Sequence, residues 1–240
     1  MSEIHIEHHK PVHTHHAIQK RKGFWTVLKE LFIDMIPVVI GILIALSFNS
    51  IKESWKEKKE EKYYLSRIKN DLEEDLKELK EDVINYEVRK KGVDYLKTYY
   101  DNPDKNLDSA IIYLNNLFGQ TAPNVSNAAY LTLQSSGKFD IIENKKITEH
   151  LVILYSDAVK GLTNITTSFN EFKQHYFNDV VFSEFDFTQL KNAQILRKLL
   201  ITLKIKNALN NLYFDEVISR YKKAIEKHQE IINEIAKEIN

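Results

Sequence analysis

One apolar stretch, residues 31–51, constrains the fold of this chain more than any other feature. It begins at Leu31, ends at Ile51 and holds a single charged side chain, Asp34. As an α-helix it would be about 31 Å long, close to the thickness of the hydrocarbon core of a bilayer. Its apolar side chains favour insertion by roughly 3 to 6 kcal/mol, whereas an acid near the edge opposes insertion by at most about 3 kcal/mol. The stretch therefore predicts one transmembrane helix over residues 34–51, rather than a buried helix of a soluble core.

The rest of the composition predicts a polar, helical extramembrane domain. The chain has 240 residues with 34 basic and 34 acidic side chains, so it lacks the positive field that attracts nucleic acids. It contains no cysteine, which excludes disulfides, thiolate metal sites and cysteine nucleophiles. Only 6 glycines and 4 prolines interrupt it, which favours long helices. We expect one helical domain over residues 52–240, no cofactor and no nucleic-acid partner.

Residues 1–23 form a polar tail in which most of the 9 histidines are clustered. Clustered imidazoles can bind zinc or nickel. Their spacing is irregular, however, and no carboxylate or cysteine scaffold fixes a coordination geometry. We therefore expect a flexible tail without a built metal site. The weak candidate ligands are His8, His9, His13, His15 and His16.

Residues 24–33 predict an amphipathic helix at the membrane interface. Apolar side chains recur at helical spacing in this segment, and the basic cluster Lys20–Lys22 precedes it. This pattern is typical of a helix that lies along the lipid headgroups. The expected interfacial anchors are Phe24, Trp25 and Phe32.

Asp34 and Pro37 suggest the start of the transmembrane helix, because an aspartate can cap free backbone amides and a proline in the first turn loses no hydrogen bond. Asp34 is alternatively a functional acid at the membrane edge, on a proton or cation path or paired with another subunit. Gly41 and Ala45 lie four residues apart, which would let a neighbouring transmembrane helix approach closely. Together they give weak support for oligomerisation or docking to another membrane protein.

After the apolar stretch, the sequence predicts a bundle of long helices. Large apolar residues recur every seven positions, which indicates a seam that packs against another helix. That interaction seam comprises Leu65, Leu72, Leu79 and Tyr86. We expect this helix to end near Pro103, short helices over residues 107–118 and 126–136, and longer helices over 144–182, from 188 to 203, and onward to the C-terminus.

An aromatic cluster near the end of the 144–182 helix predicts either bundle core or a small-molecule pocket. Its possible pocket residues are Phe169, Phe172, Tyr176 and Phe185. His228 falls on an apolar helix stripe and is expected at a packed or partly wet seam, whereas His150 and His175 have no paired acid pattern. Ser135 and Lys138 have the spacing of an acyl-transfer motif, but Gly137 breaks the helical turn that the motif needs, and we expect no catalysis.

Two segments resemble a family of uncharacterised Bacteroidota membrane proteins. The run Val38–Leu46, with Asp34 before it and Asn49 and Glu53 after it, is similar to the transmembrane signature of that family, although the family has Glu in place of Asp34 and no counterpart of Pro37. The segment from Ala129 to Asn144 is similar to a second family motif. The resemblance implies a membrane anchor and a helical domain, and it supplies no catalytic residues.

These features lead to one functional expectation. The chain is expected to be an all-α protein in which a single transmembrane helix is followed by an antiparallel long-helix bundle or coiled coil. It would serve as a scaffold or accessory subunit of a cell-envelope complex, with the lipid bilayer and other membrane proteins, or further copies of itself, as partners. The alternatives are a ligand-sensing bundle that signals through a partner, and a homo-oligomeric pore or transport accessory. We expect the bacterial inner membrane, with the N-terminus in the cytoplasm and the helical domain in the periplasm, although the basic residues flanking the span do not decide the orientation.

Overall fold

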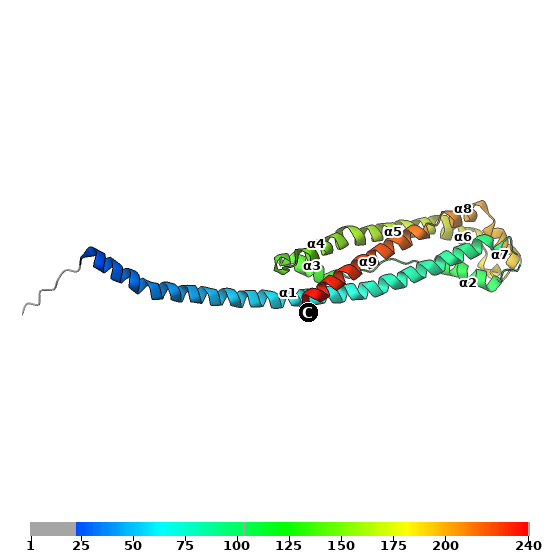
Figure 1. The fold of residues 1–240 in the computed structure, drawn as a ribbon. Coiled ribbons are helices and arrows are strands. Elements are labelled where there is room, and N and C mark those ends of the chain that lie inside the picture. The colour runs from blue at the N-terminus through cyan, green and yellow to red at the C-terminus, as the bar shows by residue number, and fades with distance from the viewer. Residues whose placement is uncertain (1–22, 103, 240) are drawn as a thin grey trace, which may run out of the picture. The chain divides into compact units, whose positions relative to one another are not determined.

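The computed structural model describes residues 23–102 and 104–239, and every regular element within them is helical. The chain divides into two compact units, Met1–Trp55 and Lys56–Asn240. Helix α1, Phe24–Tyr99, contributes its first part to the N-terminal unit and its second part to the C-terminal unit (Figure 1). The predicted all-α class is confirmed.

In the N-terminal unit, α1 begins at Phe24 and passes through Asp34 and Pro37 without a break. The prediction that a helix starts at Asp34 is therefore wrong. A proline inside a helix removes one backbone hydrogen bond, yet the helix continues on both sides of Pro37. Asp34 consequently lies within the helix and does not cap its N-terminus.

The C-terminal unit contains the second part of α1 and a series of shorter elements. The α-helices are α2 Leu107–Phe118, α3 Ala128–Ser135, α4 Lys145–Ile153, α5 Lys160–Lys173, α6 Asp179–Glu184, α7 Ala193–Leu200, α8 Leu203–Asn211 and α9 Phe214–Ile239. The short 3₁₀ turns are η1 Phe139–Ile141 and η4 Phe187–Gln189, and the π-helical segments are η2 Leu154–Val159 and η3 Gln174–Asn178. The stretch from α4 to α6 is thus helical throughout, as predicted for 144–182, but two π-helical segments interrupt it.

Side-chain caps explain several helix boundaries. Asn106 accepts a hydrogen bond from the Ser109 amide at the start of α2, and Asn144 accepts one from the Lys146 amide at the start of α4. At the end of α3, Gly137 has φ 67°, a left-handed conformation that favours glycine. The helix predicted over 188–203 is present as α7 but is shorter than predicted, because Asn192 caps its start and Thr202 caps the separate helix α8 that follows.

Helix α9 runs antiparallel to the part of α1 in the C-terminal unit. Lys62 Nζ on α1 donates to the carbonyl of Ile239, whereas Glu87, further along α1, pairs with Lys222, earlier in α9. Helix α9 is also antiparallel to α4 and α5, because His150 of α4 meets Glu234 late in α9 whereas Phe169 of α5 packs against Phe214 at its start, and Figure 1 shows α5 beside it. The antiparallel bundle predicted for this domain is confirmed.

The core of this bundle is built on the seam of α1. Leu65, Leu72, Leu79 and Tyr86 are all at most 1% exposed. The Tyr86 ring packs edge-on against Phe169 of α5 and also contacts Tyr221 of α9. The seam therefore holds the chain's own helices together, and its side chains are not exposed for contact with another protein.

Candidate functional site

Within the N-terminal unit, residues 31–51 present an apolar helical surface on all sides. The large apolar side chains of residues 31–51 are between 47% (Val39) and 69% (Phe48) exposed. No heavy atom outside its own helix and adjacent residues lies within 4 Å of the position of a Cβ on Gly41. Within the described residues, one helix is long and apolar enough to cross a membrane, with a mean hydropathy of 2.5 in its most apolar window and no part of that window buried.

The predicted membrane residues all lie on this unit. Phe24, Trp25 and Phe32 are exposed, as are Asp34 and Ala45. Large exposed apolar side chains in the C-terminal unit, such as Ile84 and Leu203, are scattered over several elements. Scattered residues of this kind are normal on a soluble surface, whereas a continuous apolar surface indicates contact with lipid or protein.

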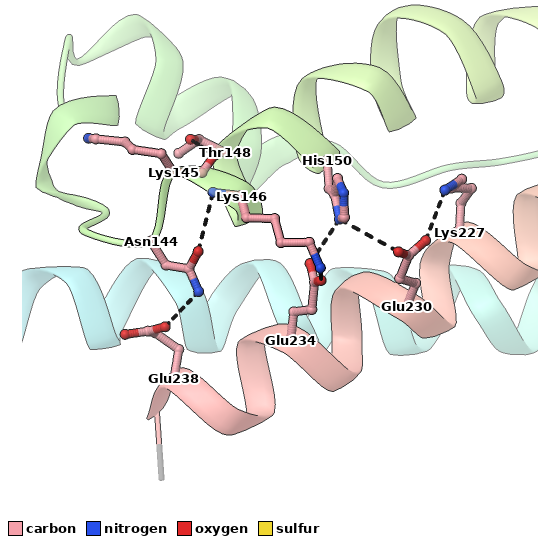
Figure 2. A network of polar contacts seen from close by, with 9 residues as sticks. All are labelled: Asn144, Lys145, Lys146, Thr148, His150, Lys227, Glu230, Glu234 and Glu238. Atoms are coloured by element: carbon pink, nitrogen blue, oxygen red, sulfur yellow. Dashed lines mark hydrogen bonds and ion pairs between the residues drawn. The ribbon is translucent and has the colours of Figure 1, made fainter.

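A second feature is a polar cluster between α4 and α9 (Figure 2). Nδ1 of His150 lies 2.8 Å from Oε2 of Glu234 and 4.0 Å from Oε1 of Glu230. Glu230 and Glu234 are one turn apart on α9 and present their carboxylates to the same side. Lys146 pairs with Glu234, and Lys227 donates to Glu230 at 2.9 Å.

The lysines keep both carboxylates of this cluster ionised. Partial burial raises the pKa of Glu234, but the hydrogen bonds from Lys146 and His150 outweigh this and hold the pKa below its usual range. The hydrogen bond from Lys227 lowers the pKa of Glu230. The cluster is thus a pair of carboxylates beside an imidazole, and the ammonium groups of Lys146 and Lys227 are the counter-ions of the carboxylates.

Sequence reasoning did not find this cluster. The prediction that His150 has no paired acid is wrong. The acids come from α9, about 80 residues further along the chain. A usable signal existed in the Glu-x-x-x-Glu spacing of Glu230 and Glu234, which places two carboxylates on one helix face.

A groove of about 670 Å³ lies beside the π-helical segment η3 and helix α8. Of the possible pocket residues, Phe172 and Tyr176 line it, whereas Phe169 and Phe185 are buried in the core. The groove also contains Lys204 and the amide side chains of Asn207 and Asn211, so it combines apolar walls with polar groups at one side. π-helical segments occur often at functional sites.

The bundle also buries polar groups that its sequence did not single out. The Lys173 side chain is buried and donates to the carbonyls of Leu117 and Gly119, and burial lowers the pKa of its amine to about 8. Asp82 on α1 is 8% exposed, and burial raises the pKa of its carboxyl to about 6.

Acids of α1 also hold the connecting segments in place. Asp75 accepts the Ser126 amide at 2.7 Å, and Asp71 accepts the Ala129 amide at 3.1 Å, so both lie at the N-terminus of α3. His228 is fully buried, as predicted, with Nε2 3.7 Å from Oδ2 of Asp75. The histidines of the N-terminal tail (His8, His9, His13, His15 and His16) lie outside the described residues.

Comparison with known proteins places the chain within a family but adds no activity. The chain matches no curated protein. It also matches no solved structure. One family model, described as a family of unknown function (DUF6090), matches residues 34–157, which are more than half of the chain. The match includes residues 34–51 of the apolar stretch and His150, and it ends before α5 and α9. The chain therefore belongs to the family of unknown function DUF6090.

Proposed function

We propose that this protein is a membrane-anchored helical scaffold or accessory subunit of a cell-envelope complex. The observation that carries the proposal is the helix surface over residues 31–51, which is apolar and exposed around its whole circumference. An apolar surface of that length is unfavourable in water, because each Å² of exposed apolar area costs about 25 cal/mol of free energy. A bilayer removes this cost, so the helix is an anchor.

In the proposed role, the C-terminal unit is a folded body whose outer surface, and not its seam, would contact partners. Its apolar seam is buried in its own core, so the bundle is folded without a helix from a partner. Its chemistry is that of helix packing and surface ion pairs, and we propose no turnover for it. The partners are then the bilayer and either other membrane proteins or further copies of the chain, with the bundle in the periplasm and the N-terminus in the cytoplasm.

Native mass spectrometry of protein gently extracted from its own membranes tests this role. A complex of fixed composition with other membrane proteins is the expected result, and the mass of a bare monomer would contradict a scaffold role. A homo-oligomer would favour the pore or transport accessory.

Replacing Gly41 with Leu should weaken the association if Gly41 and Ala45 form the contact face. Gly161→Leu is the matched control, because Gly161 also has open space around it but lies on α5.

The groove beside η3 supports a second candidate function, the binding of a small amphipathic molecule that regulates the complex. Its volume lies within the range of about 300–1,000 Å³ typical of small-molecule sites. Mass analysis of compounds released from the purified protein tests this function. Asn207→Trp, which fills the groove, should remove a bound compound, whereas Asn210→Trp, on the same helix but outside the groove, should retain it. Equal retention by both variants would exclude the groove as the binding site.

A further inference from the structure

We propose that His150, Glu230 and Glu234 form a binding site for a divalent transition-metal ion, with zinc as the best-fitting metal. The site would join α4 to α9 and goes beyond the anchoring role, so it can fail while that role stands. The ligand atoms that these residues offer all lie within 4.8 Å of one another. One imidazole nitrogen and two carboxylate oxygens form a donor set that suits zinc, which accepts both kinds of ligand.

The distances leave room for an ion after a small side-chain adjustment. Zinc binds nitrogen at about 2.0–2.1 Å and carboxylate oxygen at about 2.0–2.2 Å, so the ligand atoms of a tetrahedral site lie about 3.4 Å apart. The separations from His150 Nδ1 are 2.8 Å to Glu234 and 4.0 Å to Glu230, one shorter and one longer than that spacing, so small side-chain shifts are needed to admit an ion. The Glu230 side chain is 41% exposed and can rotate, whereas His150 and Glu234 are 19% and 15% exposed and are held by the helix interface.

The two helices supply a framework that a loose surface cluster lacks. Glu230 and Glu234 project from adjacent turns of α9, and His150 faces them from α4 (Figure 2). Both helices pack on the same core cluster, through Ile147 and Leu151 of α4 and Ile231 and Ile235 of α9. Three protein ligands leave a fourth position open for water, as in zinc sites that are not closed.

A divalent metal ion can replace the lysine ammonium groups at the two carboxylates without a change in net charge. At present, Lys146 and Lys227 neutralise Glu234 and Glu230, and their side chains are 62% and 48% exposed. A divalent cation carries the same charge as these two ammonium groups, and both lysines can move into solvent when it binds. Lysine and metal therefore compete for the same carboxylates, and this competition distinguishes a metal site from an ordinary network of ion pairs.

Binding would stabilise the bundle, because an ion that binds only the folded state adds free energy by mass action. His150 and the two glutamates are brought together only when α4 and α9 pack, so they form no such site in the unfolded chain. We expect zinc to raise the unfolding temperature of the C-terminal unit and the chelator EDTA to reverse the rise.

Calorimetric titration with zinc chloride tests the site. The full chain is used in detergent, with every tail histidine replaced by asparagine, because clustered tail histidines would also take up zinc. This background protein should bind one zinc ion, and Glu234→Gln should weaken its binding at least tenfold. Lys146→Gln should tighten binding, since it removes the competing cation. His175→Gln, an exposed histidine outside the cluster, should leave binding unchanged.

Two outcomes would overturn the proposal. One is the absence of zinc binding by the background protein, and the other is binding that Glu234→Gln and His150→Gln leave intact. If Glu234→Gln disturbs the fold, as judged by circular dichroism in EDTA, the Lys146→Gln variant decides. Weaker or unchanged zinc binding by a folded Lys146→Gln variant would show that lysine does not compete with metal at these carboxylates.

Discussion

Asp82 provides the sharpest test of the energetics of the bundle. Its side chain is buried on α1 with one carboxylate oxygen unpaired, and this burial raises its pKa from 3.8 to about 6. Nearby Glu78 and Glu81 raise the pKa further, and only Arg89 and Tyr221 oppose the shift. The charged carboxylate is therefore less stable in the folded protein than in the unfolded chain.

The pKa shift fixes the sign and size of a mutational effect. Because the folded pKa is the higher one, the folded state holds the proton more tightly, and stability falls as pH rises from 3.8 through 6. Raising the pKa from 3.8 to about 6 corresponds to about 3 kcal/mol above pH 7. Asp82→Asn carries no charge at any pH, so it should raise the unfolding free energy by about 3 kcal/mol at pH 8. The gain should fall to about half of that value at pH 5 and to less than about 1 kcal/mol at pH 4.

Urea unfolding of the full chain in detergent, followed by circular dichroism between pH 4 and pH 8, measures this difference. The contributions of groups that titrate in both proteins cancel when the unfolding free energy of the natural chain is subtracted from that of the variant. Asp94→Asn is the matched control, since Asp94 lies on the same helix but is exposed, and its effect should stay within about 0.5 kcal/mol. A difference that does not vary with pH, or a variant that is less stable at pH 8, would refute the reasoning.

Two further predictions concern packing and capping. Leu72→Ala should lower the unfolding free energy by about 2–5 kcal/mol, because Leu72 is fully buried, whereas Leu203→Ala, at a position 75% exposed, should change it by less than about 0.5 kcal/mol in the same urea assay. Asp71→Ala should cost about 1 kcal/mol and speed hydrogen exchange at the Ala129 amide, which loses its acceptor. Unchanged exchange at that amide would show that Asp71 does not hold the start of α3.

Hydrophobic periodicity was sufficient to predict the long elements. The apolar stretch, the heptad seam of α1 and the extent of the 145–184 helical stretch all follow from side-chain spacing, which reports directly on which helix face is buried. The short helices near the C-terminus were not predicted well. Their boundaries depend on caps by Asn192 and Thr202, each a single polar residue within a run that otherwise favours helix.

The polar cluster was beyond reach from sequence for a different reason. His150 meets Glu230 and Glu234 only because α9 folds back antiparallel to α4, and the register of that pairing is set by the whole core. Similarly, Phe169 and Phe172 lie three residues apart, yet the first packs in the core and the second lines the groove. Local spacing shows that both are apolar, but the packing of α8 against η3 decides their roles.

The anchoring of residues 31–51 in a bilayer is the central claim, and alkaline carbonate extraction of membranes that contain the protein tests it most directly. The natural chain should remain in the membrane pellet. A double variant, Ile40→Arg with Ile44→Arg, should be released into the supernatant, because each arginine near the middle of the span opposes insertion by about 2.5–3.5 kcal/mol. Leu203→Arg, at an exposed apolar position of the C-terminal unit, should behave like the natural chain. Release of the natural chain by carbonate would contradict the account.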